Sequence, residues 1–342
     1  MPMDGVMLGF VARQLDTILR DGRVDRVIQP EKDEIHLMIR SQGANHRLVL
    51  SAAANAARVH LSEHAKTGPM EPPMLCMLFR KYLCGGRVLA VRRIAGDRIL
   101  EIDVSNLSEL GDPVTRTLVV EIMGRHSNII LRTEDGRIID AARHVGQDIS
   151  RVRQVMPGLP YAYPPTQGKL DPETADAEAV ASALENAGGK LEKAIGASIA
   201  GFSPQAAREA AVRTGMDGSA LVSEINVQAA ANALCDYFHQ MPSLSPCVVT
   251  LDDLGAPTDV FPFPQKHLPT GKTAQFDDPS AALDAYFYER DRRDRLNQRN
   301  MILFVRQSSG SNDMERNRRG LPCIALRFRS ESRFVSVGNH VQ

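Results

Sequence analysis

The chain has 342 residues, with 41 basic and 41 acidic side chains, so its formal net charge is zero. This length allows two domains and a large hydrophobic core. The balanced charge predicts no partner by itself, so a nucleic-acid surface would have to be a local patch. Aromatic residues make up 5% of the chain and tryptophan is absent, which argues against repeated base-stacking surfaces.

The N-terminal half predicts an α+β fold. Apolar residues recur at spacings of three and four from Leu8 to Ile18, which indicates a helix that ends at Asp21-Gly22. A second helix is expected after Pro72-Pro73, ending at Gly85-Gly86. Short apolar or alternating runs predict nine strands, at residues 24–29, 34–41, 45–51, 57–61, 88–94, 98–104, 115–123, 128–133 and 137–143. Asp135-Gly136 is a strong two-residue hairpin signal, and helices alternating with runs of strands favour an α+β domain.

The second half predicts mostly helices. A proline-rich link at residues 157–165 leads into an alanine-rich stretch, residues 171–240, that is interrupted by glycines. Ser203-Pro204 is an N-cap followed by proline, which opens a helix over residues 205–214. Short helices joined by glycine turns suggest a helix-hairpin-helix unit, whose turns suit phosphate; an ordinary small helical bundle is the alternative. Residues 247–263 look extended, and Asp278-Pro279 should start a further, strongly charged helix.

Charged residues stand at the ends of two predicted strands. Asp97-Arg98 precedes one strand, and the stretch from Glu121 to Asn128, which contains Arg125, follows another. Loops at strand ends can hold charges in water while the sheet fixes their position. Both arginines could hold a phosphate through two hydrogen bonds, with Arg87, Arg92 and Arg93 as a basic rim. Exposed ion pairs without a function are the alternative.

Other patterns favour no catalytic, metal or cofactor site. His60 and His64 have the spacing of zinc ligands on a helix, but the local pattern is not helical and no third ligand is apparent, so we expect solvated histidines. Gly271-Lys272-Thr273 resembles the end of a P-loop, but Lys266 stands where that motif needs glycine. The five cysteines, which form no C-x-x-C pair, favour reduced thiols in the cytoplasm. No leader or membrane-length apolar run is recognised, and we expect a cytoplasmic protein that does not enter a membrane.

Several motifs in fixed order resemble the NFACT family, which includes fibronectin-binding-protein-A-like proteins and bacterial ribosome quality-control factors. They cover roughly residues 3–299. The matching stretches are Asp4-Gly5, Gly22-Arg23-Val24, Ile28-Gln29-Pro30, Glu34 to Leu37, Asp97-Arg98, Glu121 to Asn128, Gly201-Phe202-Ser203-Pro204 and Ala207-Arg208-Glu209.

The resemblance implies a fold and a function. The family has an N-terminal domain similar to Fpg-type DNA glycosylases, here expected as a mixed β domain with helices, then a helix-hairpin-helix domain, a coiled coil and an RNA-binding domain. Its bacterial members bind the large ribosomal subunit that carries an obstructed peptidyl-tRNA, and recruit alanyl-tRNA for untemplated alanine tailing. Carried over by motif, the tRNA-handling residues are Asp97, Arg98, Glu121 and Arg125. This function needs no enzymatic chemistry in the chain itself and no cofactor.

The resemblance also sets the expected domains. We expect an N-terminal domain over residues 1–168, a helix-hairpin-helix domain over 169–242 and an extended segment returning to the first domain over 243–275. A coiled coil should begin over 276–299, followed by an atypical, disordered tail over 300–342. Most of the coiled coil and the C-terminal RNA-binding domain are therefore expected to be missing, as in a truncated chain.

Two other functions remain as alternatives. Pro2 stands where Fpg-type DNA glycosylases use an N-terminal proline amine as nucleophile, but Met3 and Asp4 follow instead of glutamate, and no cysteine pair suits their zinc finger. The older family name suggests a surface protein that binds fibronectin in the extracellular matrix, against which the missing signal sequence and anchor argue.

Overall fold

The computed structural model describes residues 2–165 and 168–296. The chain divides into a unit that ends at Arg290 and a second unit that begins at Asp291. In the second unit, residues 291–296 are described and are helical. The end of the predicted coiled coil, the predicted tail over 300–342 and Cys323 lie outside the described residues.

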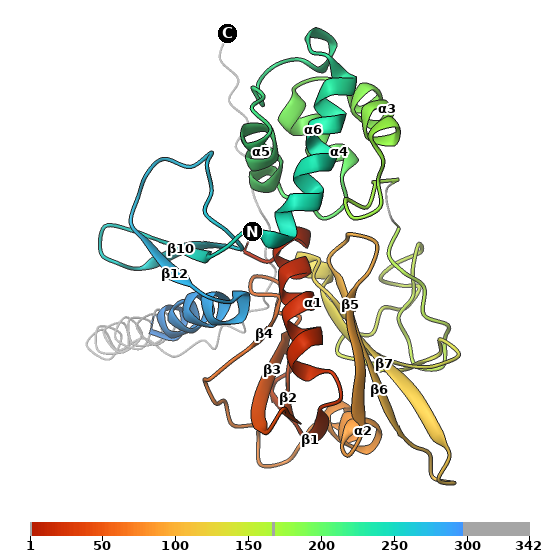
Figure 1. Ribbon diagram of the computed structural model, residues 1–342. Helices are drawn as coiled ribbons and strands as arrows, with labels where there is room; N and C mark the ends of the chain where they lie inside the picture. Colours follow the sequence, from red (N-terminus) through yellow and green to blue (C-terminus); the bar gives the residue numbers. More distant parts are fainter. Residues whose placement is uncertain (1, 166–167, 297–342) are drawn as a thin grey trace, which may run out of the picture. The chain divides into compact units, whose positions relative to one another are not determined.

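One nine-stranded sheet forms the framework of the N-terminal region, in the order β4-β3-β2-β1-β5-β6-β7-β8-β9 (Figure 1). Its elements are α1 (Gly5–Leu19), β1 (Arg23–Glu31), β2 (Glu34–Ser41), β3 (Ala44–Ser51), β4 (Arg58–Leu61), α2 (Met74–Leu83), β5 (Arg87–Arg93), β6 (Ile99–Leu107), β7 (Pro113–Glu121), the 3-10 turn η1 (Gly124–His126), β8 (Asn128–Thr133) and β9 (Ile138–Ala141). The α+β prediction is confirmed. A mixed β arrangement is expected from the resemblance, but the ladders between these strands are all antiparallel. Short turns join the successive strands from β1 to β4 and from β5 to β9, and β5 pairs with β1 after the chain has passed through α2.

The core of this region lies between the sheet and its two helices. Asp4 caps α1 by accepting a hydrogen bond from the Met7 amide at 2.9 Å. The predicted apolar stripe of α1 is buried, with Leu8, Val11 and Leu15 in one cluster with strand residues and with α2. Because the two helices pack against the sheet, the ends of its strands are held in fixed positions.

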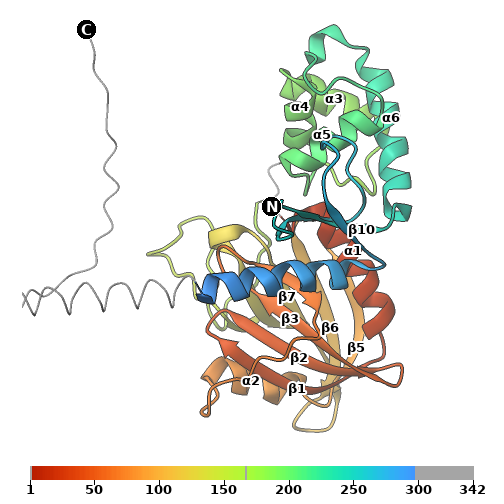
Figure 2. The same cartoon turned by 90° about the vertical axis from the view of Figure 1, so that its left-hand side faces the viewer.

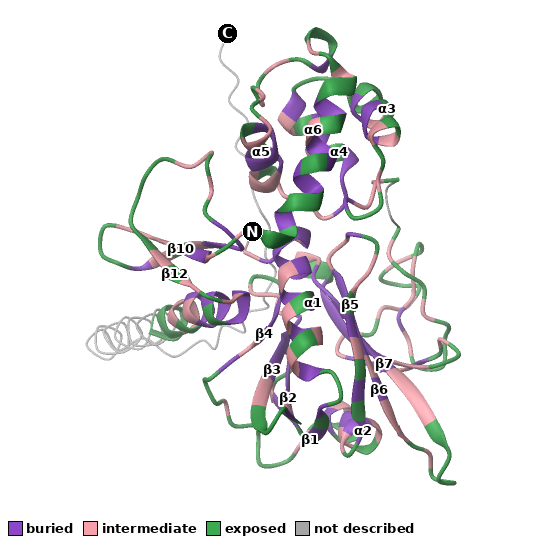
Figure 3. Cartoon of the chain, viewed as in Figure 1, coloured by how far each residue is buried: buried purple, intermediate pink, exposed green. Residues whose placement is uncertain are grey.

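The hairpin of β6 and β7 is longer than its apolar pattern predicts. The ladder continues to the pair Leu107–Pro113, beyond the predicted ends at 104 and 115. The tip of this hairpin is exposed (Figure 3). Backbone pairing rather than burial extends it, and hydrophobic periodicity reports only burial.

Four helices follow, with a core of their own. They are α3 (Ala177–Ala187), α4 (Leu191–Ser198), α5 (Pro204–Arg213) and α6 (Val227–Gln240), with the 3-10 turns η2 (Val222–Glu224) and η3 (Met241–Ser243). Val180, Leu184, Ile195 and Leu234 are buried in one cluster. Ser203 caps α5 as its sequence predicts, accepting from the Ala206 amide at 3.2 Å. The helix-hairpin-helix assignment stays a prediction.

After these helices the chain packs against the first core again. Strands β10 (Cys247–Leu251), β11 (Pro257–Phe261) and β12 (Thr273–Phe276) form a small sheet in the order β11-β10-β12. Cys247 and Val249 join the core cluster of the N-terminal region. Residues 279–290 are helical, and this helix crosses the large sheet beside β3 (Figure 2). No helix within the described ranges is long and apolar enough to span a bilayer.

His60 is buried under the 279–290 helix, contrary to the expectation of a solvated side chain. Its ring is 2% exposed, stacks on Phe287 at 6.0 Å between centroids, and lies 3.9 Å from Asp284. Burial, and then the nearby charge of Arg58, lower the pKa of His60 to about 4. Local sequence could not reveal this because the covering helix lies more than 200 residues further along the chain.

Acid should therefore destabilise the protein as the pH falls from 6.5 toward 4. The folded-state pKa of His60 lies below its ordinary value of 6.5, so its stabilising contribution is complete above pH 6.5 and is lost as the unfolded chain gains a proton that the folded chain excludes. We expect His60→Phe, which keeps the ring stack, to flatten this part of the pH profile of the unfolding free energy, measured with urea. The burial of Glu34 would raise its pKa, but His36, Arg58 and Lys66 lower it from 4.5 to about 2. The stability that Glu34 contributes is therefore lost as the pH falls from about 4.5 to 2, mostly below the window of His60. Parallel profiles for variant and wild type would contradict the role of His60.

Candidate nucleic-acid interface

A cleft of about 430 Å³ lies between the sheet region and the helices. Asp97 and Arg98, on the turn between β5 and β6, form part of its lining. The other lining residues come from the start of α1, the end of β7, the proline-rich link, the segment before α3 and the α4–α5 junction; they are Asp4, Met123, Pro164, Pro165, Lys169, Ala200, Gly201, Phe202, Ser203, Pro204 and Gln205. Stretches nearly 200 residues apart in sequence therefore meet in one place.

Three glycines allow this meeting. The Gly5 amide donates to the Gly201 carbonyl at 2.8 Å. A Cβ on Gly5 would lie 2.4 Å from the Gly201 Cα, and one on Gly201 would lie 2.2 Å from the Gly96 carbonyl oxygen. Gly96 and Gly201 also have positive φ, +67° and +73°, which favours glycine. The backbones of α1, the β5–β6 turn and the α4–α5 junction thus touch at a point where no side chain fits.

The β5–β6 turn presents Asp97 and Arg98 to the cleft. The Asp97 carboxylate accepts from the Arg98 amide at 2.7 Å, and its Oδ1 lies 3.9 Å from the Arg98 Nε. The two side chains are 29% and 31% exposed. The Arg98 carbonyl accepts from the Ile122 amide at 2.9 Å, which fixes the turn to the end of β7. A cation and an anion that remain accessible in a built cleft can bind phosphate, ribose hydroxyl or base amine.

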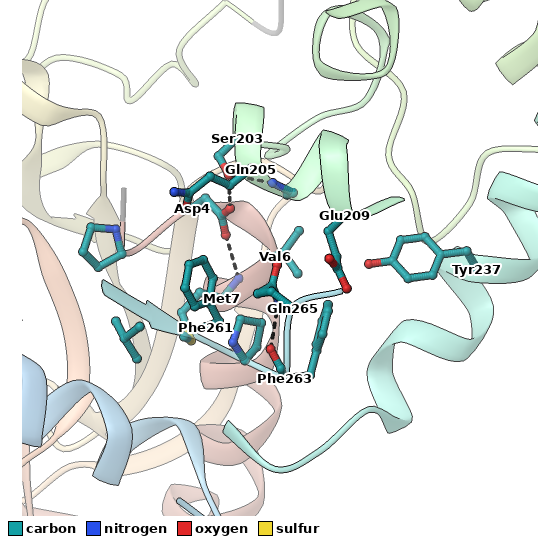
Figure 4. Close-up of a pocket in the computed structure, with 14 residues that line it drawn as sticks. Asp4, Val6, Met7, Ser203, Gln205, Glu209, Tyr237, Phe261, Phe263 and Gln265 are labelled. Carbon is teal, nitrogen blue, oxygen red and sulfur yellow. Dashed lines mark hydrogen bonds between the residues drawn. The ribbon is translucent and has the colours of Figure 1, made fainter. Parts of the chain in front are cut away.

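Asp4 supports the cleft from the start of α1, although it is not among the predicted site residues. Asp4 is half-buried, and its carboxylate accepts from the Ser203 hydroxyl at 2.6 Å as well as from the Met7 amide (Figure 4). Burial raises the pKa of Asp4, against the lowering effect of Ser203. Its position directly before a predicted helix was the available signal, since aspartate is a preferred N-cap. One side chain therefore caps α1 and joins it to the cap of α5.

Glu121 lies beneath the cleft wall rather than in the cleft. Its side chain is 1% exposed and forms a two-point ion pair with Arg153, in which the Nη1–Oε2 distance is 2.9 Å. The Tyr161 hydroxyl donates to the same carboxylate at 2.8 Å. On the neighbouring strand, buried Glu101 accepts from the Tyr163 hydroxyl at 2.6 Å. These contacts hold the link 161–163 on the sheet directly before Pro164 and Pro165, so Glu121 acts on the cleft by positioning its wall.

Arg125 lies outside the cleft, on the exposed turn η1 that follows Met123. Its carbonyl accepts from Arg143 Nη1 at 2.7 Å, and its Nε donates to His126 at 3.0 Å. The strand register pairs Ile99 with Glu121 and Glu121 with Asn128. The four predicted site residues thus share one end of β6, β7 and β8, but only Asp97 and Arg98 line the cleft.

The predicted basic rim is wrong. Arg93 is buried, and its guanidinium donates to the Gly5 carbonyl at 2.7 Å and to Glu173 at 2.6 Å. Arg92 pairs with Glu101 and Asp103, and Arg87 lies at the other end of β5. Alternation along a strand points neighbouring residues to opposite faces, so closeness in sequence did not bring these arginines together.

Within the described residues no group of three or more His, Cys, Asp or Glu side chains is arranged to hold a metal ion.

The pattern that defines the NFACT N-terminal and middle domains matches residues 4–321. The chain belongs to the NFACT family. Among curated NFACT relatives, it is 33% identical over 299 residues to Rqc2 homolog RqcH of Bacillus subtilis (strain 168), covering 87% of this chain and 51% of that protein. It is 33% identical over 323 residues to Rqc2 homolog RqcH of Streptococcus suis (strain 05ZYH33), covering 94% and 54%.

Solved structures carry the same NFACT architecture. The N-terminal part of the fibronectin/fibrinogen-binding protein from Streptococcus suis has a TM-score of 0.69 and 32% identity, covering 84% of this chain and 99% of that one. The fibrinogen binding protein from Staphylococcus aureus has a TM-score of 0.70 and 30% identity, with the same coverage. The family match runs past residue 299, so the resemblance extends further along the chain than the motifs indicated. The chain spans about half the length of the curated relatives named above.

Proposed function

We propose that this NFACT chain binds tRNA through the Asp97–Arg98 cleft in ribosome-associated quality control. Its curated relatives are named as Rqc2 homologs, which supports a role in that process. The observation that carries the proposal is the convergence of three family motifs, Asp4-Gly5, Asp97-Arg98 and Gly201 to Pro204, on one cleft with an accessible ion pair. Arg98 would hold an RNA phosphate through its planar guanidinium, and Asp97 would orient it or accept from a ribose hydroxyl or base amine.

The proposal extends to the partners of the process. The chain would bind the large ribosomal subunit that carries an obstructed peptidyl-tRNA, and would recruit tRNA, most simply alanyl-tRNA, for untemplated alanine tailing. It would do so in the cytoplasm, without a cofactor and without covalent chemistry of its own. The pocket that Pro2 lines argues only against the glycosylase alternative (Figure 4): its volume of about 20 Å³ is close to that of one water, too small for an extruded base.

We expect Asp97→Ala combined with Arg98→Ala to weaken tRNA binding by about 10- to 100-fold, because hydrogen bonds to charged groups contribute about 1.5–3 kcal/mol. Fluorescence anisotropy with labelled tRNA measures the affinity, and thermal unfolding checks the fold. Arg98→Lys should be intermediate, since lysine lacks the guanidinium fork. Asp97→Asn keeps an acceptor for the Arg98 amide and so separates the charge of Asp97 from its role in the turn.

Asp135 and Arg137 provide a matched control, because they form an exposed Asp–Arg pair at 3.5 Å across another hairpin turn. Alanine at both positions should leave tRNA affinity unchanged. An equal loss for the control pair, or unchanged affinity in the folded cleft variant, would reject the cleft as the tRNA site.

The names of the solved relatives keep binding of fibronectin or fibrinogen as a second candidate. Surface plasmon resonance with immobilised fibronectin and fibrinogen tests it. Specific binding that survives the cleft variant, in a chain that does not bind tRNA, would favour this second function.

A further inference from the structure

Five arginines lie on one face of the large sheet, at the end away from the Asp97–Arg98 cleft. They are Arg23 and Arg26 of β1, Arg40 of β2, Arg47 of β3 and Arg87 of β5, and together they are called the arginine face. These strands are neighbours in the sheet, and β3, β2 and β1 are seen side by side in Figure 2. Four of the five side chains are exposed and that of Arg47 is half-buried.

The register arranges the arginine face in two rows. Arg23 is the direct partner of Arg40 on one side and of Arg87 on the other. In the next row Arg26 pairs with Met38, which pairs with Arg47. Cross-strand partners point to the same side of a sheet with Cβ atoms about 5 Å apart. The inward neighbours Val24 and Ile39 are buried in the core, so the arginines point to the opposite face.

This arrangement has little internal compensation. Asp25 lies 3.9 Å from Arg23, and Arg87 and Arg47 donate to the backbone carbonyls of Asp21 and Glu63. Across residues 2–165 and 168–296, Arg26 and Arg40 form no ion pair. Like charges directly opposite each other destabilise a sheet, and a set of five basic groups with one acidic partner carries a local positive field in a chain of zero net charge.

Protection against aggregation does not explain the arginine face. Charged side chains serve that purpose on edge strands, but the edges of this sheet are β4 and β9. The guanidinium fork of arginine suits phosphate oxygens, and its plane can stack on unpaired bases. Arginines on neighbouring strands are about 4.8 Å apart, and the two rows are about 7 Å apart along a strand. The arginine face can therefore offer several donors to consecutive phosphates.

We propose that the arginine face binds the phosphodiester backbone of RNA as a second contact, separate from the cleft. The length of β5 puts Arg87 about 20 Å from the cleft end of that strand. The proposal uses the RNA-binding role inferred above, but it does not depend on the cleft.

The test removes three positive charges from the face of the full chain. Arg23→Gln, Arg26→Gln and Arg40→Gln are combined, and the probes are bulk tRNA and purified large ribosomal subunits at several salt concentrations. We expect affinity for at least one RNA to fall about tenfold or more near 0.1 M salt, and the slope of log affinity against log salt to decrease by about two to three. The thermal midpoint should stay the same or rise, since like charges are removed.

A control variant loses the same charge elsewhere: Arg137→Gln, Arg151→Gln and Lys193→Gln, all exposed. It should bind both RNAs as wild type does. Loss with tRNA would identify tRNA as the RNA, and loss with the subunit alone would identify ribosomal RNA. Phosphatidylserine vesicles serve as a third probe for both variants. Unchanged affinity and salt slope for both RNAs would overturn the proposal, and loss of binding to the vesicles alone would overturn it by making the face a membrane contact.

The cleft variant separates this proposal from the proposed function. If the arginine-face variant loses RNA binding while alanine at Asp97 and Arg98 has no effect, the arginine face stands and the cleft proposal fails. If only the cleft variant loses binding, the arginine-face proposal fails and the cleft stands.

Discussion

Gly201→Ala is expected to lower the free energy of unfolding by about 2–5 kcal/mol. Alanine at φ +73° is strained by about 1–2 kcal/mol. Its Cβ would also lie 2.2 Å from the Gly96 carbonyl oxygen and 2.8 Å from the Gly5 Cα, and both are backbone atoms that cannot rotate away. Overpacking of this kind costs about 1–3 kcal/mol. Urea unfolding measures the total.

Gly215 supplies the control for this contact. Its φ is +75°, and a Cβ there would meet nothing within 4 Å. Gly215→Ala should therefore show only the strain of the backbone. The difference between the two variants isolates the close approach of the three backbones, and equal destabilisation would show that this approach is not what requires glycine. The close contact of the backbones at Gly5, Gly96 and Gly201 also shapes the cleft. We therefore expect Gly201→Ala to weaken tRNA binding as well.

Glu121→Ala is expected to cost about 3–5 kcal/mol, as for other buried ion pairs that lose one partner. The variant would leave Arg153, 15% exposed, without its carboxylate and would remove the acceptor of the Tyr161 hydroxyl. The link 161–163 should loosen, and tRNA affinity should fall because Pro164 and Pro165 line the cleft. Urea unfolding and anisotropy with labelled tRNA measure the two effects.

Glu109 is the matched control for Glu121. It forms an ion pair with Lys81 at 2.8 Å on the surface, with its side chain 83% exposed. Glu109→Ala should change neither stability nor tRNA affinity appreciably, since water and ions screen such pairs. If Glu121→Ala behaves like Glu109→Ala, then Glu121 does not position the cleft wall. If stability falls while tRNA affinity is unchanged, the link 161–163 is structural only.

The placement of Glu121 changes how its motif is interpreted. By motif, Glu121 belongs with Asp97, Arg98 and Arg125 among the residues predicted to handle tRNA. The fold gives them different positions: an accessible pair in the cleft, a buried carboxylate beneath its wall, and an exposed arginine on the adjoining turn. A motif can thus contain both contacting and positioning residues, and only burial and hydrogen bonding distinguish them.

Features that depend on neighbours in sequence were predictable. The helix over the Leu8–Ile18 stripe, the hairpin at Asp135-Gly136 and the Ser203 cap of α5 all rest on contacts within about four residues, so local pattern and backbone preference determine them. The family motifs likewise indicated which short stretches matter.

The tertiary structure alone decided which of these stretches meet. The contact of Gly5 with Gly96 and Gly201, the burial of His60 by the 279–290 helix and the pairing of Arg23 with Arg40 and Arg87 all join distant segments. Such contacts follow from the register and curvature of the whole sheet, because a shift of one residue in a strand would turn every side chain to the other face. The sequence by itself therefore determined the elements and the family, and the fold decided which charges become a cleft, a buried support or an open arginine face.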